Sequence, residues 1–403
     1  MNPQYPVLHS LNALRVIAEY FVVHVHLSRY FLSPPTPSIV EALVVDLMSF
    51  FFVLSGFVAT YTHMDSNGFD DKESWLDYIQ RRLHKTYPIY FLNSFINLVG
   101  MYVTNILNQV TMPGILHYCS IGDLFLVGTW SFCNLIEENV RQGWYLQTLF
   151  WLWFIFPLLH RFLMPNLEHY TETKSILIYI LSQIPWILVV KYPGLRDSIR
   201  CVPLFRLGEF TMGMCAALEV RHRSGGRRAI VLTILLLLNY LLDFFIFQEM
   251  PSVCMGRLVD SSVTNWDQFA RNVTYSHEAP CIPVWNGFQS KSSIVWFYLI
   301  HWIASMEYNN QEVHVLNWNF FRHMSPFSLQ LYMTHETIAG ILIWIGSYSK
   351  YPIWQLDTLV FTTYLLSYSF YCYIQPILDK TWRGKRESHA PQLAPLCSSH
   401  AIE

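Results

Sequence analysis

Three ionisable side chains recur along one apolar segment near the N-terminus, LNALRVIAEYFVVHVHLSRYF at residues 11–31. On a helix that turns 100° per residue, Arg15 and His26 point to within about 20° of each other, and Glu19 lies about 40° from Arg15. His24 falls on the opposite face. A neutral histidine can act as a general base, and an arginine beside it can stabilise negative charge that develops on an oxygen. The spacing therefore predicts a reactive face formed by Arg15, Glu19 and His26.

The same residues also admit a purely structural interpretation. Arg15 would then extend toward lipid headgroups, and His26 would make one hydrogen bond to a neighbouring helix. Arg15 and Glu19 are four residues apart, so each can neutralise the other in an apolar environment.

A basic cluster follows later in the chain, in the stretch DYIQRRLHKTYPIY at residues 77–90. Arg82 and Lys85 are three residues apart and share a helix face, and Arg81 precedes them. Arginine offers paired donors to a phosphate, and lysine offers a point charge. The cluster is therefore either a cytosolic anchor of a membrane helix or a binding site for a phosphorylated ligand.

Two further groups of polar residues lie within apolar segments. Arg206 and Glu209, three residues apart, can form an ion pair that serves as a structural latch. His335 is expected to form a hydrogen bond between helices. Small residues beside the predicted latch would let neighbouring helices approach closely, namely Gly208, Gly213, Ala216 and Ala217.

The elements that must position these groups are apolar helices. Of the 403 residues, 53% are hydrophobic and 13% are charged, whereas a soluble protein has about 25% charged residues. The net charge of −2 gives no field for nucleic acid, and no His/Cys cluster has the spacing of a metal site, so neither partner is predicted. The composition excludes intrinsic disorder, a disulfide-rich miniprotein and a cytosolic enzyme. We expect an all-α polytopic membrane protein in contact with the lipid bilayer.

A membrane helix needs about 20 mostly apolar residues, and about ten segments of the chain qualify. The expected fold is therefore a bundle of about ten transmembrane helices. The interrupted stretch 115–132 is interpreted as a re-entrant or interfacial piece. The expected spans are 11–32, 40–62, 86–107, 144–164, 175–191, 203–220, 228–248, 291–308, 326–347 and 353–377.

Lysine and arginine in short loops predict the orientation. The basic groups after the second, sixth and tenth spans would share the cytosolic side, together with both termini. The polar segment 249–290 would then face a lumen, where Asn272-Val273-Thr274 is a glycosylation acceptor. Cys254 and Cys281 bracket this segment; they would either form a disulfide or stay reduced.

Several collinear motifs resemble those of the acyltransferase type three family of membrane acyltransferases. The resemblance spans nearly the whole chain, and its most specific element is Ser49–Phe57, SFFFVLSGF. The other motifs are Arg15 with His26, the basic Arg81–Tyr90 loop, Trp144-Tyr145-Leu146 with Phe156–Leu159, Phe205–Met214, Leu331–His335 and Gln375-Pro376.

This resemblance implies transfer of an acyl group, usually acetyl, from cytosolic acyl-CoA to a hydroxyl group. His26 would be the catalytic histidine and Arg15 its electrostatic partner. Arg82 and Lys85, with Arg81, would bind the CoA phosphates. The acyltransferase domain would span residues 1–380, with 381–403 as a cytosolic tail. Trp144, Arg206, Glu209 and His335 would have secondary or structural roles.

The chain departs from the family pattern at several positions. The Arg-x-x-Arg motif is Arg82-x-x-Lys85 here, the serine of Trp-Ser-Leu-x-x-Glu is Tyr145, and its glutamate is Leu149. Glu19 stands where the family usually has a small residue and is a candidate for the carboxylate. A transporter that uses the intramembrane charges and a catalytically inactive homologue are the competing interpretations. The acceptor is predicted only as a hydroxyl of a sugar, a lipid or a small natural product.

Overall fold

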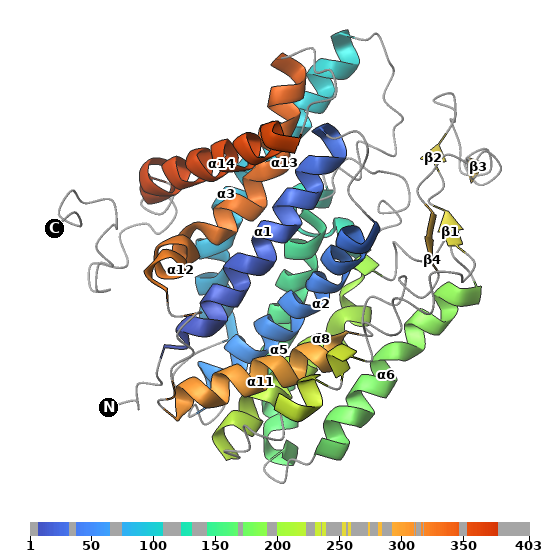
Figure 1. The fold of residues 1–403 in the computed structure, drawn as a ribbon, viewed down its shortest axis with the longest axis vertical. Coiled ribbons are helices and arrows are strands. Elements are labelled where there is room, and N and C mark those ends of the chain that lie inside the picture. The colour runs from blue at the N-terminus through green and yellow to red at the C-terminus, as the bar shows by residue number, and fades with distance from the viewer. Residues whose placement is uncertain are drawn as a thin grey trace, which may run out of the picture.

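The computed structural model is a bundle of long helices (Figure 1). The first three helices are α1 (His9–Phe31), α2 (Ser38–Tyr61) and α3 (Trp75–Leu107), and a 3₁₀ turn, η1 (Gly128–Trp130), comes next. The structure describes residues 7–31, 38–64, 75–107, 122–130, 143–167, 172–191, 200–222, 230–234, 236–238, 252–254, 257–258, 273–274, 281–283, 292–309, 311, 316, 318–345 and 353–377.

The second half of the chain continues the bundle. Its helices are α5 (Gly143–Leu167), α6 (Glu172–Lys191), α8 (Pro203–His222), α11 (Ser293–Tyr308), α12 (Asn319–Met324), α13 (Ser328–Ile345) and α14 (Ile353–Ser369). A 3₁₀ turn, η6 (Ser325–Phe327), leads into α13, and a π-helical segment, η7 (Phe370–Ile374), follows α14. Of the expected span 228–248, the structure describes only 230–234 and 236–238, which are helical.

Two short antiparallel strand pairs lie at one edge of the bundle (Figure 1), within the predicted polar loop 249–290. Strand β1 (Ser252–Cys254) pairs with β4 (Cys281–Pro283), and β2 (Arg257–Leu258) pairs with β3 (Val273–Thr274). The fold is thus helical, as predicted, with a small β element that the expectation of a loop did not include.

The centre of the bundle is the close packing of α2 on α8. A Cβ added at Gly56 of α2 would collide with the carbonyl oxygen of Phe210, and one added at Gly213 of α8 would collide with the carbonyl oxygen of Val53. Glycine at both positions therefore lets the two backbones touch. This confirms that Gly213 permits close helix approach, and it gives Gly56 of the SFFFVLSGF motif the same role.

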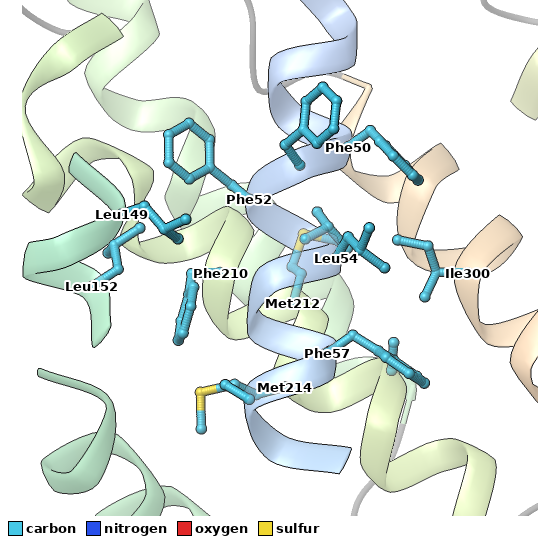
Figure 2. Close-up of a cluster of buried hydrophobic side chains, with 14 of the residues drawn as sticks. Phe50, Phe52, Leu54, Phe57, Leu149, Leu152, Phe210, Met212, Met214 and Ile300 are labelled. Carbon is cyan, nitrogen blue, oxygen red and sulfur yellow. The ribbon is translucent and has the colours of Figure 1, made fainter. Parts of the chain in front are cut away.

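Apolar side chains from four helices surround this contact (Figure 2). Phe52 and Phe210 lie beside Leu149 and Leu152 of α5, and Ile300 of α11 lies on the other side of α2. All five are nearly or fully inaccessible to solvent. Burial of such side chains is the main source of specific packing in the bundle.

The direction of each helix fixes which groups share an end. Near the start of α2, Asp46 accepts hydrogen bonds from Ser292 and from Trp296 of α11. At the other end of α11, Glu307 accepts the backbone N–H of Ser10 in α1. Helix α2 is therefore antiparallel to α1, and it ends where α1 begins; we call this the N-terminal end of the bundle.

Residues 122–130 form a short helical turn followed by η1, held between α3 and α5. The hydroxyls of Tyr87 and Tyr90 donate to the carbonyls of Leu124 and Asp123, at 2.9 and 2.5 Å. Trp151 of α5 donates to the carbonyl of Leu126, whose φ of 60° is left-handed. The re-entrant or interfacial interpretation of 115–132 stays a prediction, and residues 115–121 and 131–132 lie outside the described part.

Among the described residues, one helix is long and apolar enough to cross a membrane, Gly143–Leu163, and Asp46–Tyr61 is apolar but shorter. The ten transmembrane spans of the sequence interpretation are therefore not established by length and composition. Helix α1 is amphipathic because of its polar stripe.

Helix α3 begins at Trp75, eleven residues before the expected span at 86, so the basic cluster lies within a helix and not in a loop.

The contact of α2 with α8 predicts a specific sensitivity to added volume. Replacing Gly213 with Ala should lower the free energy of unfolding by about 1–3 kcal/mol, because the new methyl group forces the backbones apart. Thermal unfolding of the purified protein in detergent measures this loss. Gly100→Ala is the matched control, since nothing lies within 4 Å of a Cβ at Gly100; equal melting temperatures for the two variants would contradict the prediction.

Candidate active site

The three residues of the predicted reactive face on α1 all contact one segment, η6 with the first half of α13. Arg15 bonds Ser325, Glu19 bonds the backbone of Tyr332, and His26 bonds His335. The partners rise in the same order along both helices, so α1 and α13 are parallel. The structure thus places Arg15, Glu19 and His26 on one face, as the helical spacing predicted.

His26 and His335 form the polar contact furthest along the stripe. Nδ1 of His26 lies 2.9 Å from Nε2 of His335, and the rings are nearly parallel, with centroids 5.2 Å apart. His335 is fully buried, whereas His26 is half-buried. His24 points elsewhere and lies against the ring of Tyr20. The choice of His26 over His24 agrees with this geometry.

Arg15 and Glu19 bind separate backbone groups. Nη2 of Arg15 donates to the carbonyl and to the hydroxyl of Ser325, both at 2.8 Å. Glu19 is 3% exposed, and its carboxylate accepts the N–H of Tyr332 at 3.0 Å. The two charges still act on each other electrostatically. The stripe therefore carries a half-buried guanidinium and a buried carboxyl group, each also fixed by hydrogen bonds.

Tyr145 of α5 closes the site on the side of α2. Its ring packs edge-on against Tyr332, with centroids 5.5 Å apart, and its hydroxyl lies 3.4 Å from the hydroxyl of Ser55. It is also coupled electrostatically to Arg15 and Glu19. This departure from the family pattern therefore sits within the candidate site, where the phenol replaces a much smaller serine.

Leu149, the other departure on α5, lies in the apolar core instead. It is 4% exposed and neighbours Phe52 and Leu152 (Figure 2). A carboxylate at this position would be surrounded by hydrocarbon. Leu149 is therefore a packing residue, and Glu19 is the carboxylate that the structure places on the reactive face.

The basic cluster lies at the N-terminal end of the bundle, in the first half of α3. Arg82 is half-buried, with its guanidinium over the rings of Tyr78 and Trp153 at 5.4 and 5.6 Å. Arg81 and Lys85 are exposed. The sequence interpretation paired Arg82 with Lys85; in the helix, the two exposed cations are Arg81 and Lys85, one turn apart, while Arg82 is oriented by aromatic rings.

A histidine beside this cluster adds no charge at neutral pH. His63, in the turn after α2, is packed edge-on against Tyr78 and bonds the carbonyl of Ala59 at 2.8 Å. The pKa of His63 is lowered to about 4, because burial and the nearby charge of Arg82 lower it by more than the hydrogen bond to Ala59 raises it. His63 therefore adds no positive charge to the basic cluster.

The predicted latch of α8 is present as a fully buried ion pair. Nη1 of Arg206 lies 2.8 Å from Oε1 of Glu209, and both side chains are 0% exposed. The hydroxyl of Ser49 in α2 donates to the same oxygen at 2.9 Å. The guanidinium also lies over the rings of Phe52 and Trp144. Arg206, Glu209 and Trp144 thus join α8 to α2 and α5, away from the α1 stripe.

The remaining predicted sites fall in the strand pairs or outside the described residues. The register of β1 with β4 places Cys254 directly opposite Cys281, which is compatible with the predicted disulfide. Asn272 and the tail 381–403 lie outside the described part. No cluster of His, Cys, Asp or Glu that could hold a metal occurs among the residues searched.

Sequence reasoning missed the partners of the stripe, Ser325 and Tyr332. Ser325 contributes its backbone carbonyl as well as its hydroxyl, and Tyr332 contributes a backbone N–H, so residue type alone carries little signal for either. They lie ten and three residues before His335, and only Tyr332 falls within the Leu331–His335 motif of the resemblance.

A match to a known protein family includes every residue of this site. A family model described as an acyltransferase domain, that of the type three acyltransferases, matches residues 8–374, from the start of α1 to the end of η7. No curated protein and no solved structure matches the chain. The match includes α1, the basic cluster, the latch and α13. The chain therefore belongs to the acyltransferase type three family.

Proposed function

We propose that this protein is a membrane-embedded O-acyltransferase that moves an acyl group, most simply acetyl, from acyl-CoA to a hydroxyl. The observation that carries the proposal is the α1 stripe. It sets a half-buried imidazole, His26, on the same face as a half-buried cation, Arg15. Membership of an acyltransferase family supplies the reaction class. The acceptor would be a sugar, a lipid or a small natural product.

The donor would approach from the N-terminal end of the bundle. Arg81, Arg82 and Lys85 lie at that end, and arginine and lysine suit the phosphates of CoA. Arg15 lies on the same side of the stripe, with His26 about 16 Å further along α1. An acyl-CoA bound by the basic cluster would therefore extend its thioester along the stripe toward His26.

His26 of the stripe can carry out both proton transfers that the reaction needs. A ring nitrogen of His26 would take the proton of the acceptor hydroxyl while its oxygen attacks the thioester carbonyl. Arg15, about 16 Å from His26 along α1, would stabilise the phosphate charge of the CoA. The carbon–sulfur bond then breaks, and the proton passes from His26 to the CoA thiolate, which leaves an ester and free CoA. Transient acylation of His26 is the two-step variant of the same transfer.

The outer faces of the helices support placement in a bilayer. On α3 and α6, large apolar side chains that recur along one face are exposed, and such patches are rare on soluble monomers. They are Phe91, Phe95, Ile96, Val99 and Val103 on α3, and Ile176, Leu177, Ile180, Leu181 and Ile184 on α6. In the proposed orientation, the N-terminal end with the basic cluster is cytosolic and the strand pairs are lumenal.

His26 is the first residue to test. His26→Ala should reduce transfer of labelled acetyl from acetyl-CoA in isolated membranes by about 10²–10⁴-fold, because the general base is lost. His24→Ala is the matched control, since His24 lies on the same helix but packs against Tyr20; its activity should stay near wild type.

Three results would count against the proposal. Retained activity in His26→Ala would remove His26 from the mechanism. Wild-type protein that binds acyl-CoA without transferring the acyl group would indicate an inactive homologue. Substrate flux without consumption of acyl-CoA would indicate a transporter.

The basic cluster predicts a binding defect that is separable from chemistry. Arg82→Gln combined with Lys85→Gln should weaken acetyl-CoA binding at least about tenfold, because each charge-assisted hydrogen bond contributes about 1.5–3 kcal/mol. Calorimetry on purified protein measures the Kd. Arg322→Gln removes an exposed cation of α12, beside Ser325 at the same end, and should leave the Kd unchanged; equal weakening by both would mean a general charge effect.

The orientation predicts glycosylation of the segment that contains the strand pairs. When the chain is expressed in a eukaryotic host, Asn272 should carry a glycan, so treatment with an endoglycosidase should increase its gel mobility. Asn272→Gln should abolish that shift. A wild-type chain that is inserted and active but insensitive to the endoglycosidase would contradict a lumenal position for residues 249–290.

A further inference from the structure

His335 makes hydrogen bonds with both ring nitrogens, and its partners differ in kind. Nδ1 lies 2.7 Å from the carbonyl oxygen of Tyr332 and 3.3 Å from that of Leu331. A carbonyl oxygen accepts hydrogen bonds and cannot donate them. Nδ1 of His335 must therefore carry the hydrogen, because the other tautomer would direct a lone pair at two oxygens.

The proton on Nδ1 of His335 determines the direction of the hydrogen bond between His335 and His26. In a neutral imidazole only one nitrogen is protonated, so Nε2 of His335 is an acceptor. The neutral form is favoured because the ring is 0% exposed, and a second proton would bury an ion there. Nδ1 of His26, 2.9 Å from that acceptor, is then the donor. Its own Nε2 is left with the lone pair.

We propose that His335 is a positioning residue, which holds His26 in the tautomer whose Nε2 is the base for acyl transfer. This inference rests on the proposed function of the α1 stripe. Without an acceptor at His335, either nitrogen of His26 could carry the proton, and the ring could rotate. With it, the ring orientation and the basic atom are both set before substrate arrives.

The same contact assists the proton transfer. When Nε2 of His26 takes the proton of the hydroxyl, its Nδ1–H donates more strongly to His335, which remains neutral. A carboxylate in this position would stabilise the imidazolium more, but it would also place an unpaired anion in a fully buried position. The neutral imidazole avoids that burial cost and keeps the acceptor.

The burial of the two rings assigns the roles. His26 is half-buried and can reach a substrate, whereas His335 is enclosed by α13 and its neighbours. A pair of equivalent histidines would have similar access. The difference makes His26 the reacting residue and His335 the residue that acts through it.

The test replaces His335 with residues that keep or remove the acceptor. In His335→Gln, the amide oxygen can reach the position of Nε2. His335→Asn keeps a donor near the carbonyl of Tyr332 but is too short to accept from His26, and His335→Leu has no acceptor. We expect His335→Asn and His335→Leu to lower kcat by about 10²-fold or more with the KM for acetyl-CoA unchanged, and His335→Gln to stay within about tenfold of wild type.

A second readout is independent of acyl transfer. Diethylpyrocarbonate modifies the unprotonated imidazole of His26, and mass spectrometry of the purified protein gives the rate at that residue. The rate should be similar in wild type and His335→Gln and several-fold slower in His335→Asn. If the wild type transfers no acyl group, the proposed function fails, and this comparison still decides the inference.

Two outcomes would overturn the inference. Equal loss of kcat in His335→Gln and His335→Asn, with unchanged modification of His26, would mean that His335 only fills space. Wild-type kcat in both His335→Asn and His335→Leu would mean that His26 needs no orienting partner. Should His335→Leu fail to accumulate, the comparison of Gln with Asn is sufficient, since both are polar and similar in size.

Discussion

The pairing of one polar stripe with one partner helix determines the rest of this structure. Arg15, Glu19 and His26 would be costly in an apolar bundle, and η6 and α13 together provide a hydrogen-bond partner for each of them. Two of the three partners are backbone groups, which cannot be exchanged by mutation. The contact therefore depends on the position and direction of η6 and α13 as a whole.

The motifs that resemble the family each have a physical role in holding this arrangement. In the SFFFVLSGF motif, Ser49 bonds Glu209, Ser55 lies beside Tyr145, and Gly56 admits the carbonyl of Phe210. Tyr87 and Tyr90 of the Tyr-Pro-x-Tyr motif hold residues 122–130 against α5. Most of these residues therefore build the scaffold, and only the stripe and the basic cluster face a substrate in the proposed mechanism.

Helical periodicity was sufficient to predict the shared face of Arg15, Glu19 and His26, because it depends only on spacing along one helix. The partner of that face lies about 310 residues away in sequence, and no local pattern encodes such a contact. Helix α3 begins at Trp75, before the expected apolar span 86–107, because an apolar window ignores helix formers such as Gln80 and Arg81. Tyr145 and Leu149 both depart from the family pattern, and the sequence does not distinguish their roles. Only the packing shows that Tyr145 lies in the candidate site and Leu149 in the apolar core.

The distance in sequence between α1 and α13 has a consequence for synthesis. A ribosome that has produced the first helix must still add almost 300 residues before α13 exists. During that time, Arg15 and Glu19 of α1 have only each other and transient partners. The nascent protein must therefore shelter its first helix, with the membrane insertion machinery or a chaperone, until the last third of the chain is complete. Truncated products that end before α13 would be expected substrates for quality control.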